Sequence, residues 1–449
     1  MLRLPVVSRL GRQLARFARA EQGNYAVIFA IALVPVLSFV GAAVDYSRAV
    51  KARTSMQAAL DSAALMLSKD LSSGAIATSQ ISTKATTYFN ALFTDKSALP
   101  SVTVTATYTA STSAGSTIQL TGDGNFTTTF MKIAGFPKLG INASSAWGTM
   151  RMRVAMVLDN TGSMADAGKM PAMQTAAKNL IDQLSALAKA DGDIYISIVP
   201  FAKDVNVGAD NYSKYWIDFT DWDAANGSCS SSRYTNQSSC VNNSKTWTPA
   251  NHNTWTGCVV DRDQDYDIKN TTPTNGNSAT LFPADQYSYC TTGSSAYLQP
   301  IVPLSYNWSS LKTVIDNMKP TGNTNQGIGL AWGWMTLSTG DPTNAPAKDL
   351  NYTYKDAIVL LSDGLNTQNR WYSNASQIDA RQKKLCDNAK AANITIYTVQ
   401  VNTGGDPTSG VLQYCASSSD KFYLVRSASQ TVSVFQSIGT SLSKLRVAR

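Results

Sequence analysis

The fold of the C-terminal half is decided by the stretch VAMVLDNTGSM, residues 154–164. Its first five residues form a short, continuous apolar run, which is typical of a strand buried on both faces of a parallel sheet. The run ends in Asp159, and hydroxyl-bearing residues follow at Thr161 and Ser163. Because ligands bind at the carboxyl ends of strands in open α/β sheets, this turn is the first candidate for a functional site.

Similar apolar runs recur along the rest of the chain and alternate with helical patterns. The expected strands lie at 194–199, 357–361, 394–399 and 422–425, and the expected helices near 167–190, 308–318, 327–338, 376–392 and 428–446. Buried strands that alternate with helices predict an α/β fold with a doubly wound, mostly parallel sheet and helices on both faces. We expect this domain to span residues 151–449.

The alternation stops between about 204 and 299, in a stretch rich in Asn, Ser, Thr, Trp and Tyr. A segment of this length without periodicity predicts an insertion rather than a loop. Cys386 and Cys415, which flank the strand at 394–399, can form one disulfide, and the cysteines of the insertion suggest two local ones. The cysteines of the insertion are Cys229, Cys240, Cys258 and Cys290, and the pairing of all six cysteines stays open. Disulfides predict an oxidising compartment.

Two further elements carry oxygen-bearing side chains beside predicted strands and helices. GNT at 322–324 precedes a helix, and SDG at 362–364 directly follows an apolar strand. Together with the first turn they supply three hydroxyls and two carboxylates, from Thr161, Ser163, Thr324, Asp159 and Asp363. Hard divalent cations prefer oxygen ligands. The sequence therefore predicts a Mg²⁺ site, with Mn²⁺ or Ca²⁺ as alternatives, that leaves one coordination position open to an anionic oxygen from outside.

These three elements, in this order on this strand pattern, resemble a von Willebrand factor A domain. The metal-ion-dependent adhesion site of that family has the form Asp-x-Ser-x-Ser, a distant Thr and a distant Asp. Thr161 stands where the first Ser is usual and keeps the hydroxyl. The resemblance covers residues 151–449 apart from the insertion, and it implies a competent metal site at Asp159, Thr161, Ser163, Thr324 and Asp363.

The N-terminus is first basic and then apolar. Residues 1–19 contain five arginines and no acid, and residues 25–44 contain no charge. As a helix, those 20 residues span roughly 30 Å, the thickness of the hydrocarbon layer. The positive-inside rule then places residues 1–24 in the cytoplasm. We expect an uncleaved single-pass anchor. The alternative is a cleaved secretory signal, although the apolar run exceeds the usual length of about 7–15 residues.

Residues 45–148 have the pattern of a small α+β module. A helix over 46–70 carries an apolar stripe formed by Ala49, Met56, Leu60, Ala63, Ala64 and Leu67, and a second helix is expected at about 79–93. From Ser101 onward, apolar residues alternate with threonine, which predicts antiparallel strands. A long apolar helix followed by such a sheet is the plan of a pilin-like module.

The start EQGNYAVIFAIALVPVLSFVGAAVDYSRAV (21–50), followed by QAALDSAAL (57–65), resembles the TadE/TadG-like proteins of bacterial tight-adherence (Flp) pilus systems. TadG-type members join such an anchor to a C-terminal von Willebrand A domain. The resemblance implies a non-enzymatic protein of the bacterial inner membrane, with its C-terminal bulk in the periplasm, that helps to assemble or anchor a thin pilus. Its implied partners are pilus-assembly or envelope proteins that present an acidic residue, and the sequence is compatible with a homo-oligomer.

Other classes of function fit less well. The net charge of +8 is scattered, which does not indicate nucleic-acid binding, and the single histidine excludes sites that need two. The spacing from Gly162 to Gly168-Lys169 does not fit a P-loop. A surface adhesin that contacts host or surface ligands through the same site and the insertion is the main alternative. A third is an enzyme subunit like the von Willebrand A partners of metal chelatases, against which the anchor and the disulfides weigh.

Within the insertion, three features have a functional and a structural interpretation. Acidic residues alternate at 261–267 as in a calcium loop, but Tyr266 replaces the required Gly and Thr272 the required Glu, which favours a solvated acidic loop. Tryptophans can stack on sugars or fill a disulfide-stapled core, and the core is favoured for Trp216, Trp222, Trp247 and Trp255. His252 is expected to be an ordinary surface residue.

Overall fold

A computed structural model of the chain describes residues 24–72, 75–109, 117–148, 150–188, 190–349 and 352–447. The described residues divide into an N-terminal unit, which ends at residue 148, and a C-terminal unit, which begins at Met150. The basic segment expected at 1–24 lies outside the described residues except for Asn24.

The N-terminal unit begins with a single long helix, α2 (Asn24–Ser72), which contains Pro35. The described side chains from Ile28 to Val40 are all exposed, and burial begins at Gly41. Further along, the stripe predicted from the sequence is buried: Ala49, Met56, Leu60, Ala63, Ala64 and Leu67. One helix therefore joins an exposed apolar half to a packed amphipathic half. By length and composition it can cross a membrane.

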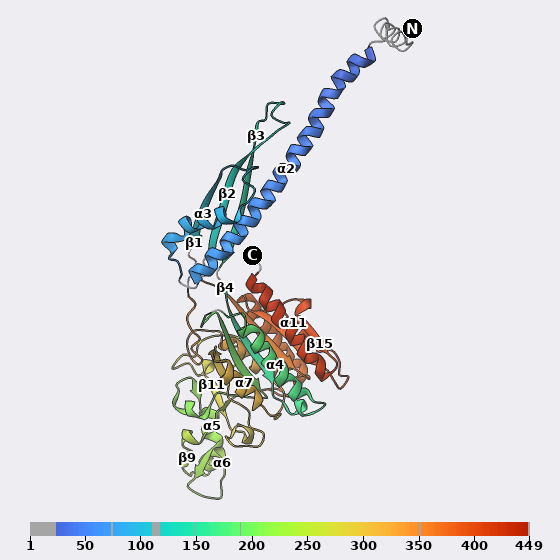
Figure 1. Ribbon diagram of the computed structural model, residues 1–449. Coiled ribbons are helices and arrows are strands. Elements are labelled where there is room, and N and C mark those ends of the chain that lie inside the picture. Colours follow the sequence, from blue (N-terminus) through green and yellow to red (C-terminus); the bar gives the residue numbers. More distant parts are fainter. Residues whose placement is uncertain are drawn as a thin grey trace, which may run out of the picture. The chain divides into compact units, whose positions relative to one another are not determined.

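A three-stranded antiparallel sheet, in the order β1-β2-β3, packs against the second half of α2 (Figure 1). Its strands are β1 (Val102–Thr109), β2 (Thr117–Thr127) and β3 (Lys138–Gly148). Because side chains alternate along a strand, one face of β2 points inward and buries Leu120 and Phe126 completely. Helix α3 (Ile81–Leu92) follows the short 3-10 helix η1 (Thr78–Gln80) and adds Phe89 to the same core.

The C-terminal unit is built on a six-stranded sheet in the order β12-β5-β4-β13-β14-β15. The strands are β4 (Met150–Asp159), β5 (Ile194–Phe201), β12 (Val302–Ser305), β13 (Thr353–Ser362), β14 (Thr395–Val401) and β15 (Phe422–Val425). All neighbours are parallel except β12, which runs antiparallel to β5 at one edge. The first strand in the sequence, β4, is thus central.

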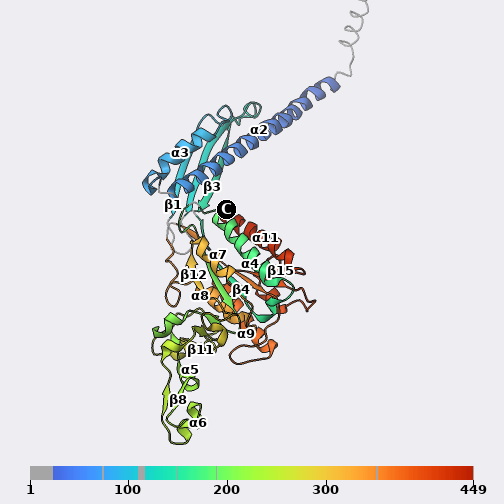
Figure 2. The ribbon, with the colours of Figure 1, turned by 60° about the horizontal axis from the view of Figure 1, so that its bottom comes forward.

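Helices cover both faces of this sheet, because alternate residues of β4 enter two separate cores. Val154 and Met156 enter the core closed by α4 (Lys169–Ser185), α7 (Trp308–Asp316) and α11 (Ala428–Val447). Ala155 and Val157 enter the core closed by α8 (Gln326–Met335), α9 (Ala375–Ala391) and α10 (Gly410–Cys415). Helices α4 and α11 lie side by side (Figures 1 and 2). The predicted mixed α/β fold is confirmed.

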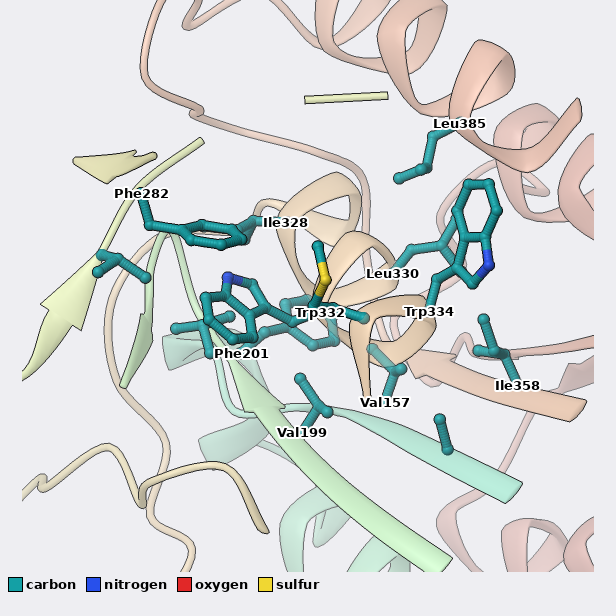
Figure 3. Packing of buried hydrophobic residues seen from close by; sticks show 14 of the residues in the cluster. Val157, Val199, Phe201, Phe282, Ile328, Leu330, Trp332, Trp334, Ile358 and Leu385 are labelled. Carbon is teal, nitrogen blue, oxygen red and sulfur yellow. The ribbon is translucent and has the colours of Figure 1, made fainter. Parts of the chain in front are cut away.

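Helix α8 lies very close to the sheet because glycine stands at two of its contact positions. A Cβ atom on Gly333 would lie 2.4 Å from a methyl group of Val157, and one on Gly329 would lie 2.7 Å from the ring of Phe201. Figure 3 shows both strand residues beneath the helix, whose tryptophans lie to either side. In the sequence QGIGLAWGWM, glycine therefore stands where the helix contacts the strands, and the large side chains lie beside these contacts.

The insertion forms its own four-stranded sheet, in the order β6-β10-β11-β7, and a separate two-stranded sheet β8-β9. Its elements are β6 (Val205–Asn206), β7 (Ile217–Asp218), α5 (Thr220–Ala225), β8 (Gly227–Cys229), α6 (Gln237–Asn242), β9 (Trp247–Pro249), β10 (Cys258–Val259) and β11 (Phe282–Asp285). The insertion also contains the 3-10 helices η3 (Ala209–Ser213), η4 (His252–Thr254), η5 (Ser278–Thr280) and η6 (Ser288–Cys290). Outside the insertion, the C-terminal unit contains η2 (Gly162–Ala165) and η7 (Ser419–Lys421). Figures 1 and 2 show β8, β9 and α6 at the end remote from β4.

Three disulfides form, as predicted. Two are local to the insertion, Cys229–Cys240 and Cys258–Cys290. The third, Cys386–Cys415, joins α9 to α10 within a buried core. The structure thereby resolves the pairing that the sequence left open.

The aromatic residues of the insertion form a core. Trp216, Trp222 and Trp255 are each at most 3% exposed, so the core interpretation of these three is confirmed. His252 lies at the surface as predicted, with 38% of its side chain exposed, but it also makes specific contacts. Its ring stacks on Phe219 with a centroid separation of 3.8 Å, and its Nε2 lies 2.8 Å from Asp223 Oδ1.

The acidic loop at 261–267 is not simply solvated, contrary to the prediction. Arg381 of α9 pairs with Asp265 at 2.7 Å and also with Asp267, whose side chain is 5% exposed. Arg370 pairs with Asp263 at 2.8 Å. These arginines lie more than a hundred residues further along the chain, which is why the local sequence does not reveal them.

Candidate metal centre

The five predicted ligand residues lie at the carboxyl ends of the strands of the six-stranded sheet. Asp159 ends β4, and Asp363 directly follows β13. These strands are parallel neighbours with Leu158 opposite Leu361, so their carboxyl ends meet. The strand order reverses between them, since the chain continues from β4 to β5 on one side and from β13 to β14 on the other. Ligands bind at such a switch point in open α/β sheets.

Hydrogen bonds bring four of the five side chains together. The Ser163 hydroxyl donates to Asp363 Oδ1 at 2.8 Å and lies 3.1 Å from the Thr161 hydroxyl. Asp159 Oδ1 accepts from the Thr161 N–H at 2.8 Å, and Asp159 Oδ2 accepts from the Ser362 hydroxyl at 2.6 Å. Two carboxylates and two hydroxyls therefore converge from turns 200 residues apart in the sequence.

Thr324 is held beside this cluster by its backbone. The Gly162 N–H donates to the Gly322 carbonyl at 3.0 Å, which joins the first turn to the loop that carries Thr324. Gly322 has a φ of +72°, a left-handed conformation that favours glycine. The Thr324 N–H donates to the Thr367 hydroxyl at 2.8 Å. Within the described ranges, no hydrogen bond joins the Thr324 hydroxyl itself to the other four side chains.

A lysine that the sequence reading missed completes the cluster. Lys169 begins α4, and its Nζ donates to Asp363 Oδ2 at 2.7 Å and to the Ser163 carbonyl at 3.2 Å. The side chain of Lys169 is 10% exposed and that of Asp363 is 1% exposed. The helix dipole disfavours a cation in the first turn of a helix. A lysine at that position, six residues after a candidate ligand, is the signal that could have found it.

Burial and the nearby charge of Asp363 raise the pKa of Asp159 to about 6. Hydrogen bonds from Ser362 and Thr161 favour the carboxylate but do not offset these two effects. Two neighbouring carboxylates face one ammonium group here. The negative charge that remains is the electrostatic environment that a bound cation would stabilise.

The donor set fits a hard divalent cation. Thr161 and Thr324 are 1% and 4% exposed, whereas Ser163 is exposed, so the cluster opens to solvent at Ser163. In the part of the chain that the structure describes, no group of three or more His, Cys, Asp or Glu side chains is arranged to hold a metal. Hydroxyls are three of the five predicted ligands here. An oxygen-only set suits Mg²⁺ or Mn²⁺ better than Zn²⁺, which prefers nitrogen and sulfur.

The insertion borders the site beside the loop that carries Thr324. Asp261 Oδ2 accepts a hydrogen bond from Asn325 Nδ2 at 2.9 Å, and burial raises the pKa of Asp261 to about 6. A Cβ atom on Gly322 would lie 3.3 Å from the ring of Tyr289. Two parts of the insertion therefore fix the position of this loop.

Comparison with protein families identifies the N-terminal segment. Residues 23–66 match the family model described as "Putative Flp pilus-assembly TadE/G-like". The match includes the exposed apolar half of α2 and most of its packed half. It confirms the predicted resemblance to TadE/TadG-like proteins at this end of the chain. No curated protein matches the chain.

Several solved structures are similar at low identity. The open conformation of the pilus adhesin SpaC from Lactobacillus rhamnosus GG has 12% identity over 76% of this chain and a TM-score of 0.36, and the match spans only 33% of SpaC. The vWF domain of the type V pili tip protein Mfa5 from Porphyromonas gingivalis has 10% identity, with 65% and 95% of the two chains covered and a TM-score of 0.36.

A third similar structure is proximal thread matrix protein 1 from the mussel byssus, with a zinc-occupied MIDAS motif. It has 14% identity, with 64% and 45% of the two chains covered and a TM-score of 0.32. These three likenesses are too weak to carry an argument about fold or function. The family match at the N-terminus does not depend on them: at residues 23–66, the chain matches the TadE/G-like model of putative Flp pilus-assembly proteins.

Proposed function

We propose that this protein is a membrane-anchored, non-enzymatic component of a bacterial tight-adherence (Flp) pilus assembly system. Its C-terminal unit is a von Willebrand factor A domain that binds partner proteins through a metal-ion-dependent adhesion site. The observation that carries the proposal is the convergence of Asp159, Thr161, Ser163 and Asp363 at the switch point of the sheet.

The proposed organisation follows the chain. Residues 25–44 span the inner membrane with the basic residues 1–24 in the cytoplasm, residues 45–148 form a pilin-like stalk, and residues 151–449 form the adhesion domain in the periplasm. Three disulfides on the C-terminal side of the span support this orientation, because the periplasm is oxidising.

The residues of the site have distinct proposed roles. Thr161, Ser163 and Thr324 hold the cation through hydroxyl oxygens, while Asp159 and Asp363 orient those hydroxyls and coordinated waters. A bound Mg²⁺, or Mn²⁺ or Ca²⁺ in its place, supplies an open coordination position for a carboxylate oxygen of a partner. The exposure of Ser163 indicates the side from which that carboxylate approaches. Charge-assisted contacts of this kind are strong and geometrically specific.

The test combines metal titration with partner capture. Full-length protein in detergent is titrated with Mg²⁺ and Mn²⁺ by calorimetry, and then used to capture the other components of its pilus system, with and without a chelator. The variant is Asp159→Ala, and the matched control is Asp166→Ala, which removes an exposed carboxylate from the same turn. We expect the control to behave as the wild type, and Asp159→Ala to lose both metal binding and partner capture.

Capture that survives both the chelator and Asp159→Ala would refute a metal-dependent adhesion site. Metal binding without any captured component would leave the site intact but contradict the assembly role.

A surface adhesin that contacts host or surface ligands is the second candidate. The contact that favours it is Asn325 to Asp261, because it places the insertion at the border of the site, where it can contribute to a ligand surface. Cell fractionation separates the two functions. Protein retained in the inner membrane supports assembly, and protein in sheared surface fractions supports adhesion.

A further inference from the structure

The loop between β2 and β3, residues 128–137, exposes a cluster of apolar side chains. Ile133 is 87% exposed, Phe136 is 59% exposed and Phe130 is 47% exposed. Lys132 and Lys138 lie beside them. Exposed apolar side chains that cluster on a protein surface mark sites of interaction with another protein or with a membrane.

This loop is fastened to α2 by a buried carboxylate. Asp45 is 0% exposed, and its two oxygens accept hydrogen bonds from the backbone N–H groups of Thr129, Phe130 and Met131 at 2.7–3.1 Å. These bonds hold the pKa of Asp45 below its usual value despite burial. Arg48 adds a hydrogen bond to the Thr129 hydroxyl at 3.1 Å. The position of the loop along α2 is therefore fixed.

That position is where α2 leaves the protein core. Side chains on α2 are exposed from Ile28 to Val40, and the first buried residue is Gly41. A Cβ atom on Gly41 would lie 2.6 Å from Phe130, so the loop contacts the helix there. Gly41 precedes the end of the charge-free run, Val44, by three residues, or about 5 Å of helix. The loop thus lies level with the last turn of the apolar segment, and both views show it beside α2 (Figures 1 and 2).

The backbone N–H groups of the loop depend little on hydrogen bonds to water. Its N–H groups are hydrogen-bonded within the unit at Thr128, Thr129, Phe130, Met131, Ile133, Ala134, Gly135 and Phe136. Such internal pairing is what a segment requires in a medium of low polarity, where an unpaired backbone group costs several kcal/mol.

We propose that residues 130–136 insert their apolar side chains into the headgroup boundary of the bilayer that α2 spans. Interfacial segments sink about 5–10 Å into this boundary, which matches the level at which the loop contacts α2. Lys132 and Lys138 extend their ammonium groups toward lipid phosphates, as lysines at membrane interfaces do. The N-terminal unit then contacts the membrane at two places, so it cannot rotate or tilt freely relative to the bilayer. This inference rests on the proposed membrane anchor and is independent of the metal centre.

Site-directed spin labelling tests the proposal on the full-length protein. All six native cysteines are in disulfides, so a single introduced cysteine can be labelled. Three variants are compared in vesicles of phosphatidylethanolamine and phosphatidylglycerol: Ile133→Cys in the loop, Leu37→Cys in the exposed part of α2, and Thr107→Cys. Thr107 is exposed on β1 opposite Gln119, roughly 27 Å from the loop end of β2.

The readout is the accessibility of each label to oxygen, which dissolves in lipid, and to a water-soluble nickel chelate. Each label is measured first in amphipol, in buffer without detergent, and then in vesicles. In vesicles, we expect the label at Ile133 to lose its accessibility to the nickel chelate and to become accessible to oxygen. The label at Leu37 should show the same accessibilities in vesicles. The label at Thr107 stays accessible to nickel. Phe136→Cys repeats the measurement from a second loop position.

The outcomes separate the inference from the anchor. Nickel access retained at Ile133 with protection at Leu37 overturns the loop insertion and leaves the anchor standing. Nickel access at both positions overturns the anchor as well. Protection of Ile133 from both reagents means that protein rather than lipid covers the loop, which also overturns the proposal.

Discussion

The ammonium nitrogen of Lys169 lies 2.7 Å from Oδ2 of Asp363, and both side chains are almost completely buried. Asp363 is also a proposed ligand, through Oδ1 and the hydroxyl of Ser163. A buried carboxylate that loses its cationic partner costs several kcal/mol. Lys169 therefore stabilises the protein without metal, and it competes electrostatically with a cation bound at the same carboxylate.

The first prediction concerns Lys169→Met, which keeps the length of the side chain and removes its charge. We expect the metal-free protein to lose about 3 kcal/mol of unfolding free energy, because Asp363 is left unpaired. We also expect tighter binding of Mg²⁺, because the repulsion between the ammonium and the cation is gone. Thermal unfolding with and without Mg²⁺, and calorimetric titration, measure the two effects.

Lys178→Met is the control for that variant. Lys178 is on the same helix, and its ion pair with Asp316 is largely exposed. Exposed pairs contribute about 0–1 kcal/mol, so this variant should change neither property by more than that. Weaker Mg²⁺ binding by Lys169→Met would show that the lysine supports the cation rather than competing with it.

The second prediction concerns pH and Asp204. Burial and then the charge of Asp285 raise the pKa of Asp204 to about 8, and its Oδ1 has no hydrogen-bond partner among the described residues. The unfolded chain has the ordinary pKa of 3.8. The folded state therefore binds the extra proton between these values. The contribution to stability is present below 3.8 and is lost as the pH rises through about 8.

Asp204→Asn removes this dependence. From pH 5 to pH 8, its unfolding free energy should rise relative to that of the wild type by about 1 kcal/mol per pH unit. Denaturant unfolding at several pH values measures the difference. Asp210→Asn, which changes an exposed carboxylate of the insertion, should run parallel to the wild type. A constant difference between Asp204→Asn and the wild type would mean that Asp204 is ionised in the folded protein.

The third prediction concerns the glycines of α8. Gly333→Ala puts a methyl group 2.4 Å from Val157, so α8 must move away from β4. Overpacking of this kind costs about 1–3 kcal/mol of unfolding free energy. Since α8 begins two residues after Thr324, we expect weaker Mg²⁺ binding as well. Gly410→Ala is the control, because its methyl group would meet no atom within 4 Å. Equal stability of the two variants would contradict the close packing seen in Figure 3.

The fourth prediction ranks two disulfides. Cys386–Cys415 closes 29 residues and is completely buried, whereas Cys229–Cys240 closes 11 residues in the remote part of the insertion. Chain-entropy arguments give about 3.5 kcal/mol for the longer loop and about 3 kcal/mol for the shorter one. Replacing the first pair with serine also buries two hydroxyls, which increases its cost. Denaturant unfolding of the two double variants gives the ranking, and an equal or smaller loss for the buried pair would contradict it.

The sequence predicts the central strands well because their side chains are buried on both faces. β4, β5, β13 and β14 each read as a continuous apolar run, and the structure places all four in the predicted sheet. The edge strand β12 was not predicted, because VPLS has only four residues and includes a proline. β3 was also not predicted, because its second half, NASSAWG, lacks the alternation of apolar and polar residues that marks β2.

The candidate site was predictable where its chemistry lies in short motifs and not where it depends on distant pairing. The turn at 159–163 and the SDG element are recognisable because oxygen-bearing residues follow apolar strands directly. The contact of Lys169 with the site was not predicted, because a lysine at the start of a helix is ordinarily interpreted as a solvent-facing residue. The contacts of Asp261 were missed because its partners, Asn325 and Arg370, are 64 and 109 residues away.

The 200 residues between Ser163 and Asp363 also set the order in which the molecule can form. As the chain is synthesised, β4 emerges long before its neighbour β13, and contacts so distant in sequence form slowly. The insertion closes its disulfides over only 11 and 32 residues, so it can mature while the sheet is still incomplete. The ligand cluster therefore cannot assemble before Asp363 is present, 200 residues after Ser163, and a chain that stops inside the insertion lacks both Thr324 and Asp363.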